Sequence, residues 1–320
     1  PIMEMAIDWK VMKGLGFSNY FSMINDLDLD AVTINQALYM IGIKGRAARY
    51  LNTYTDDWGV KRQFTGELLP FPVAHPVKNQ GDLDRYKPPV PSANPLLKAV
   101  RLAKKRCPGR AIVMMSRAVF AASWYLIGLE NLLTSYLLEP EFAKNVARIV
   151  TSYHKELLVL AIKAGVDVVI LTDDYAHKTG TLMSPAQFRE FVLPGFREIV
   201  QTVKDAGAYC VKHTDGDIWE IIDLIVESGV HGLGPLEPAA GMNYAEVRKG
   251  YSSKLCLLGN IDVDLLSRGS VADVTAKTRE LIEEVSPEGG HILSSGNTIT
   301  SSVKPANFLA MIDTARELGV

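Results

Sequence analysis

The 320-residue sequence lacks several features, and each absence excludes a class of protein. It has only three cysteines, with no CxxC pair and no disulfide framework, so we expect a reducing, cytoplasmic compartment. No apolar run approaches the roughly 18 residues that span a membrane, and no basic stretch leads into an apolar core, so we expect no membrane contact. Neither sign of charge is in excess, since the chain has 34 Lys+Arg and 36 Asp+Glu. This balance argues against nucleic-acid binding.

What the sequence does contain is a regular alternation of strand-like and helical patterns. From residue 96 onward, short apolar runs alternate with helical patterns, which is typical of βαβ units and a parallel sheet. Seven strand-like runs are visible, and an eighth could lie before residue 96. The seven runs are Ala31–Ile34, 111–116, 167–174, 208–216, 231–238, 254–262 and 290–297. We expect helices over 96–106, 121–163 with a break at Glu139-Pro140, 184–206, 218–228, 244–249, 271–285 and 305–318.

This pattern predicts a TIM (β/α)8 barrel with an N-terminal helical and proline-rich extension. Seven or eight βα units in about 300 residues fit a barrel, and no GxGxxG follows the first strand as a dinucleotide fold would require. Residues 1–52 are mostly helical in pattern, whereas 54–95 hold seven of the sixteen prolines and read as extended chain pinned against the body. We expect 1–95 to form the extension and 96–320 the barrel body, within one structural unit.

Polar side chains follow six of the strand-like runs, always on the C-terminal side. In a barrel these positions meet at one mouth, where barrel enzymes build their active sites. A single residue of this kind is more often a helix cap or a turn residue, so the convergence is the signal. The residues are Ser116, Arg117, Asp173, Asp174, Tyr175, His213, Asp215, Glu237, Asn260, Asp262, Ser294, Ser295 and Asn297.

Four of these residues could hold a metal ion. His213 and Asp215 share one side of their strand by alternation, Glu237 ends the next strand, and Asn297 lies two strands further on. Imidazole, carboxylate and amide groups all coordinate divalent ions such as zinc. The alternative is a hydrogen-bonded polar cluster without metal, with Asp215 capping the following helix. Both interpretations remain open on the sequence.

Trp58 has two interpretations as well. It belongs to the run Asp56-Asp57-Trp58-Gly59 in the irregular region before residue 96. An aromatic residue beside two acids in a loop could close over the mouth as a lid. Alternatively, it is a packed tryptophan next to a solvated turn.

Several motifs together resemble the uroporphyrinogen decarboxylase superfamily. They are the run from Gly165 to Val200, then VKHTDGD, GLGPLEPAAGM, LLGNIDVDLLSRG and GGHILSSGNTI, with TDDWG at 55–59 as a further match. The resemblance covers the chain from about Ser116 onward. It implies a TIM barrel with an N-terminal helical extension, and either decarboxylation or methyl transfer to or from corrinoid proteins.

The departures from this superfamily favour one of its branches. The decarboxylase's arginine-containing N-terminal motif has no match in residues 1–50, and Asn297 stands where that enzyme has a histidine. The thiol-methylating branch holds zinc with His-x-Cys, a glutamate and a final cysteine, where this chain has His213, Asp215, Glu237 and Asn297. The sequence thus most resembles the methyltransferases of corrinoid-dependent O-demethylase systems. The resemblance implies a site of N and O ligands.

That branch takes a methyl group from a methoxylated molecule, often an aromatic ether, and passes it to Co(I) on a separate corrinoid protein. Zinc or another divalent ion on the four residues would then bind the ether oxygen; without metal, Asp173, Asp174 or Glu237 could protonate it.

We expect Trp58, Ser116, Tyr175, Asn260, Asp262 and Ser295 to contact the substrate or the corrinoid, and we allow for a homodimer. Two alternatives remain open: a porphyrinogen decarboxylase, and a barrel that binds a tetrapyrrole or another ligand without catalysis.

Overall fold

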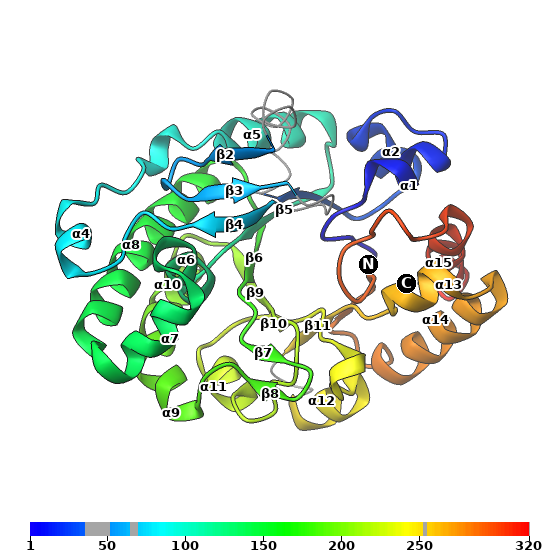
Figure 1. Cartoon of the computed structure of the whole chain (residues 1–320). Helices are drawn as coiled ribbons and strands as arrows, with labels where there is room; N and C mark the ends of the chain where they lie inside the picture. The colour runs from blue at the N-terminus through cyan, green and yellow to red at the C-terminus, as the bar shows by residue number, and fades with distance from the viewer. Residues whose placement is uncertain (36–51, 65–69, 252–254, 320) are drawn as a thin grey trace.

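The computed structural model describes residues 1–35, 52–64, 70–251 and 255–319. Its centre is a parallel sheet of seven strands that curls round on itself, with helices outside it (Figure 1). In sheet order the strands are β1 (Ala31–Asn35), β5 (Ala111–Ser116), β6 (Val168–Thr172), β9 (Tyr209–His213), β10 (Gly232–Leu233), β11 (Cys256–Leu258) and β12 (His291–Ile292). This order follows the chain, and each strand matches one of the seven expected runs.

Residues 2–7 occupy the eighth position of the ring. Ile2 forms a parallel bridge with Leu293, just after β12, and Ile7 forms another with Ile299. On the other side, the Ile2 carbonyl accepts a hydrogen bond from the Asp30 amide (3.0 Å), next to β1. The N-terminal segment therefore joins β12 to β1 and closes the barrel, which confirms both the TIM barrel and an eighth strand before residue 96.

The helices follow the strands largely as expected. The predicted break at Glu139-Pro140 is confirmed, whereas a second break at Gly128 was not expected; Gly128 has a φ of 92°, which favours glycine. Among the described residues, no helix has both the length and the apolar character of a membrane span. After β5 the helices are α6 (Val119–Ile127), α7 (Leu129–Leu138), α8 (Pro140–Ala164), α9 (Pro185–Gln187), α10 (Leu193–Asp205), α11 (Ile222–Glu227), α12 (Tyr244–Tyr251), α13 (Val263–Arg268), α14 (Val271–Val285) and α15 (Pro305–Glu317).

The region before residue 96 contributes to the barrel as well as covering it. The closing segment and β1 lie within the ring, so the barrel draws on residues from both sides of position 95. Of the helical pattern over 1–52, residues 36–51 lie outside the described part. The proline-rich region contains a small antiparallel sheet and two helical segments. The elements before β5 are α1 (Trp9–Gly14), α2 (Tyr20–Asp26), β2 (Thr53–Thr55), β3 (Lys61–Gln63), β4 (Phe71–Ala74), α4 (Gln80–Arg85), a 3₁₀ turn (Pro91–Ala93) and α5 (Leu96–Arg106).

Two hydrophobic clusters stabilise this architecture. The larger one fills the layer between sheet and helices, and the smaller one fills the inside of the ring. The inner cluster takes Met3 and Met5 from the closing segment and Val113 and Met115 from β5. Because side chains alternate along a strand, the outward Glu4 lies between the two inward methionines. The barrel is thus a packed core rather than a pore, and its polar residues collect at the mouth.

Candidate functional site

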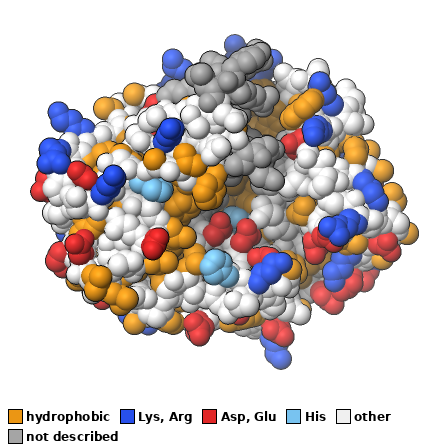
Figure 2. Space-filling view, in the orientation of Figure 1, with side chains coloured by type: hydrophobic (Ala, Val, Ile, Leu, Met, Phe, Trp, Pro, Cys, Tyr) orange, Lys and Arg blue, Asp and Glu red, His pale blue; other side chains and the backbone are white. Residues whose placement is uncertain are grey.

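A cavity of about 260 Å³ opens at the carboxyl ends of the strands. Figure 2 shows acidic and histidine side chains around a hollow at the centre of this face. The lining combines an apolar part with a set of charged and polar groups. It consists of Met5, Asn35, Met115, Arg117, Tyr125, Thr172, Asp174, His213, Asp215, Asn297 and Thr298. The described cavity therefore has the location and the mixed chemistry of a barrel active site.

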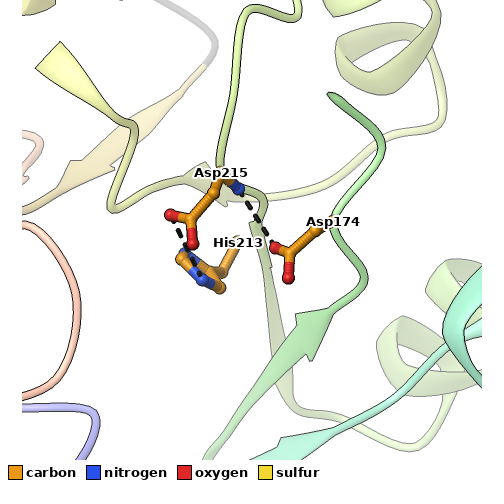
Figure 3. Close-up of side chains that lie close together, drawn as sticks. All are labelled: Asp174, His213 and Asp215. Carbon is orange, nitrogen blue, oxygen red and sulfur yellow. Dashed lines mark hydrogen bonds and ion pairs between the residues drawn. The ribbon is translucent and has the colours of Figure 1, made fainter. Parts of the chain in front are cut away.

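Three side chains on this wall lie close enough together to hold one metal ion. A ligand atom from each of Asp174, His213 and Asp215 lies within 4.8 Å of the other two. His213 ends β9 and is buried, Asp215 follows it and is partly buried, and Asp174 follows β6 and is exposed. Figure 3 shows the His213 ring beside the Asp215 carboxylate, whereas Asp174 accepts a hydrogen bond from the Asp215 amide (3.1 Å). One imidazole and two carboxylates form a donor set that suits a divalent ion.

The backbone fixes which nitrogen of His213 is available. Nδ1 lies 3.0 Å from the Pro235 carbonyl oxygen, which only accepts hydrogen bonds, so Nδ1 carries the proton in the neutral ring. Nε2, 3.9 Å from an Asp215 carboxylate oxygen, keeps its lone pair. Metal-binding histidines have this arrangement, in which a carbonyl or carboxylate orients the ring from behind. The free nitrogen could equally accept a proton.

The surroundings of Asp215 oppose the ionisation of its carboxyl group. Burial raises its pKa, and the negative charges of Asp174 and Glu237 raise it further. Protonated His213 and the hydrogen bond from Asn297 (2.9 Å) act in the opposite direction. A cation at the mouth would therefore bind where negative charge is already concentrated.

Of the four expected metal ligands, Glu237 lies outside the cluster, and Asn297 contacts it through Asp215. Asn297 donates its side-chain N–H to Asp215, and its amide oxygen accepts from the Thr298 backbone (2.8 Å). Glu237 accepts from the Gly216 amide (3.1 Å) and lies 3.7 Å from Lys178. The Asn297 side-chain oxygen and one Glu237 carboxylate oxygen, which are the atoms that would bind a metal, thus already accept hydrogen bonds. The cluster thus brings Asp174 to His213 and Asp215, whereas metal binding by Glu237 and Asn297 stays a prediction.

Glu237 belongs to a second cavity beside the first. This space of about 510 Å³ also contains Asp262 on its wall. The two cavities share Asp215 and Asn297, so the hydrogen bond between these residues stands at their common boundary. Asp262 also caps α13 by accepting from the Asp264 amide (2.7 Å). The mouth therefore has two neighbouring compartments.

Asp173 and Tyr175 lie outside both cavities, contrary to the expectation for the mouth. Asp173 is fully buried and accepts 2.8 Å hydrogen bonds from the Ala118 and Phe120 amides at the start of α6. Burial raises its pKa, with buried Lys212 opposing this. Tyr175 is fully buried as well, with its ring edge-on to Phe120 (6.1 Å). Both residues therefore lie in the wall behind the cavity, where they contact the helix layer.

Three further residues expected at the mouth, Ser116, Ser295 and Asn260, are buried in the barrel wall and line neither cavity. Ser116 is buried against His154 Nδ1 (3.2 Å), and burial lowers the pKa of that histidine to about 3. Ser295 is buried against Glu4, with its hydroxyl 2.5 Å from the carboxylate. Asn260 is 7% exposed, and its side-chain oxygen has no hydrogen-bond partner among the described residues.

Trp58 packs against α8, which favours the second interpretation of this residue. Its ring lies edge-on to Tyr153 (4.6 Å) and stacks on His154 (6.2 Å). It lines a cavity of about 20 Å³ that shares only Arg117 and Tyr125 with the main one. Asp56, beside it, holds the turn by accepting from the Trp58 and Val60 amides (3.0 Å each).

Some lining residues could not be placed at the mouth from sequence patterns. Met5 reaches it from the closing segment, and Tyr125 reaches it from α6. Lys212 is a different case, because it is fully buried behind the site, where it donates to the carbonyls of Asp173 (2.6 Å) and His213 (2.5 Å). Alternation along β9 was the available signal, because it points Lys212 away from the side of His213.

Comparison with known proteins gives matches in sequence and in structure. The family model described as "Uroporphyrinogen decarboxylase (URO-D)" matches residues 54–318. A uroporphyrinogen decarboxylase of Chlorobium phaeobacteroides is 25% identical over 264 residues, 76% of this chain and 71% of the relative. One of Tolumonas auensis is 26% identical over 267 residues, 75% and 69% of the two chains. A solved structure titled "methyltransferase from Methanosarcina mazei" has a TM-score of 0.74 at 17% identity, covering 100% of this chain and 96% of that one.

Proposed function

Because the chain belongs to the uroporphyrinogen decarboxylase family, we propose that it is one of the family's methyltransferases. It removes a methyl group from a methoxylated small molecule and passes it to the Co(I) corrinoid of a partner protein. The observation that carries this proposal is the cluster of Asp174, His213 and Asp215 on the wall of the mouth cavity. The fold shared with a solved methyltransferase is consistent with it.

The chemical problem in this reaction is the leaving group. The C–O bond breaks, the methyl carbon goes to cobalt, and the electron pair stays on oxygen as an alkoxide or phenolate. Such an oxygen leaves readily only when it is protonated or bound to a Lewis acid. The protein therefore has to stabilise negative charge at one point of the cavity.

The cluster fits a divalent ion of the zinc type. His213 presents Nε2 in a fixed orientation, and Asp174 and Asp215 offer carboxylate oxygens within 4.8 Å. An ion held there would supply Lewis acidity to the ether oxygen. Asn297 orients Asp215 through its hydrogen bond, as groups behind a ligand usually do. For a metal-free variant of the proposal, Asp174 is the one of the three expected acids (Asp173, Asp174 and Glu237) that lines this cavity.

The rest of the cavity fits a molecule with one aromatic ring. Met5, Met115 and Tyr125 provide apolar and aromatic lining next to the cluster. The volume of about 260 Å³ lies just below the roughly 300–1,000 Å³ of sites for drug-sized ligands. A tetrapyrrole macrocycle is considerably larger than one ring.

The decisive experiment supplies the protein with methoxylated aromatic compounds and a reduced corrinoid protein. We expect demethylated product only when the corrinoid protein is present, and one divalent ion per chain after purification without chelator. His213→Ala and Asp215→Ala should each lower turnover by about 100-fold or more. The control is His231→Ala, because His231 lies at the opposite end of the barrel and accepts from the Cys210 amide. Full turnover in both site variants, with folding confirmed by circular dichroism, would refute the site.

Decarboxylation of a porphyrinogen is the second candidate, because the curated relatives carry that name. Incubation with uroporphyrinogen tests it directly, and we expect no consumption. A barrel that binds a ligand without catalysis would show neither reaction. A stoichiometric ion on the cluster would argue against that third alternative.

A further inference from the structure

Arg117 brings a positive charge into the otherwise acidic mouth. It directly follows β5, is partly buried, and lines the same cavity as His213 and Asp215. Its guanidinium carbon lies 4.2 Å from the centre of the Tyr125 ring, so the group stacks on an aromatic face of the cavity wall.

A comparison with Arg62 shows what is unusual about Arg117. Both guanidiniums stack on Tyr125, Arg62 at 4.6 Å. Arg62 is buried in an ion pair with Asp56 (2.7 Å), so its charge is balanced within the protein. Arg117 forms no ion pair with any carboxylate in the described ranges, and its side chain has no hydrogen-bond acceptor there. Its charge thus lies at the cavity without a partner from these residues.

An unbalanced guanidinium at a cavity wall is suited to one kind of ligand. Arginine stays protonated in proteins, and a partly buried charge is costly unless it is paired. Its planar set of N–H donors matches a carboxylate with two parallel hydrogen bonds. Stacking on Tyr125 restricts the guanidinium plane, which reduces the conformational freedom lost when a ligand binds.

We propose that Arg117 binds a carboxylate of the substrate, so that the methoxylated molecule is an aromatic acid. The identity of the reacting group rests on the proposed function, whereas the binding of an anion by Arg117 does not. Charge also favours one orientation. Arg117 attracts the substrate carboxylate, whereas Asp174 and Asp215 either repel it or, with an ion bound, balance the charge of that ion. The methoxy end is left to face His213.

The test measures binding without turnover, by titration calorimetry of 3- and 4-methoxybenzoate against the matching neutral methoxybenzamides. In the unmodified protein the acids should bind about 10- to 100-fold more tightly than the amides. Arg117→Gln should reduce this ratio to about one, and Arg117→Lys should restore part of it because the charge returns without the planar donor set. Lys178→Gln is the matched control, because it removes a positive charge from the neighbouring cavity and should keep the ratio.

Each other outcome overturns the inference. Equal binding of acids and amides, failure of every compound to bind, or an unchanged ratio in Arg117→Gln would each do so. A protein that binds the acids through Arg117 but never demethylates them would contradict the proposed function alone. Demethylation of neutral ethers without preference for acids would contradict the role of Arg117 alone.

Discussion

Glu4 should make the stability of the barrel depend on pH. It is buried in the closing segment, where its carboxyl oxygens accept hydrogen bonds from the Ser295 amide (2.9 Å) and hydroxyl (2.5 Å). Burial raises its pKa from 4.5 to about 8, although the Ser295 hydrogen bonds act in the opposite direction. Between these two values the folded protein binds more protons than the unfolded chain, so the free energy of unfolding falls as pH rises.

The magnitude follows from the width of that window. Each pKa unit corresponds to about 1.4 kcal/mol. Between pH 4.5 and pH 7 Glu4 ionises in the unfolded chain but stays protonated in the folded protein, and this removes about 3 kcal/mol of stability. Glu4→Gln cannot ionise, and its amide can still accept from the Ser295 backbone and donate to the Ser295 hydroxyl. The stability advantage of this variant should therefore grow from less than about 1 kcal/mol at pH 5 to about 3 kcal/mol at pH 7.

Urea unfolding followed by circular dichroism at pH 5, 6, 7 and 8 measures this growth. Glu246→Gln on α12 is the control, because its carboxylate is exposed in the folded protein and its loss should add no new pH dependence. A difference between Glu4→Gln and the unmodified protein that stays constant from pH 5 to pH 8 would refute the reasoning.

Two further predictions separate structural residues from the site. Asp173→Ala should destabilise the fold by about 3–5 kcal/mol, because it leaves the buried amides at the start of α6 and the charge of Lys212 without their partner. Urea unfolding measures this change, and a loss of less than about 1 kcal/mol would contradict the prediction. Trp58→Ala should cost about 3 kcal/mol by removing the contact with Tyr153, while the KM for substrate changes less than about twofold. A large rise in KM without loss of stability would instead indicate a lid.

Much of the fold could be predicted because its signals are local. The apolar runs after residue 96 and the break at Glu139-Pro140 follow directly from residue type. The closing segment could not be recognised, because residues 2–7 pair with strands almost 300 residues away and show no strict alternation of apolar and polar residues. Helix α13 was not predicted, because its six residues are too few to show a clear helical period of apolar positions.

Two local signals predicted part of the site: the position after a strand, which placed Arg117, Asp174 and Asn297 at the cavity, and alternation along a strand. His213 and Asp215 face the same cavity as expected, because alternation relates residues two apart. Of the adjacent acids Asp173 and Asp174, one supports α6 and the other lines the cavity, and the sequence could not tell them apart because β6 already ends at Thr172. The hydrogen bonds of Asn297 to Asp215 and Thr298 could not be predicted, because they depend on how the folded chain brings distant segments together.

The seam formed by residues 2–7 also has a consequence for synthesis of the protein on the ribosome. Ile2 is synthesised long before its bridge partner Leu293. The strands that precede β12 can therefore pair with one another while the edge of residues 2–7 that faces β12 is still unpaired. Until β12 emerges, the nascent chain presents an open sheet with an unpaired edge, the form of a β-protein most prone to associate with other chains. Because closing so long a loop is slow, this interval is when the polypeptide most needs a chaperone.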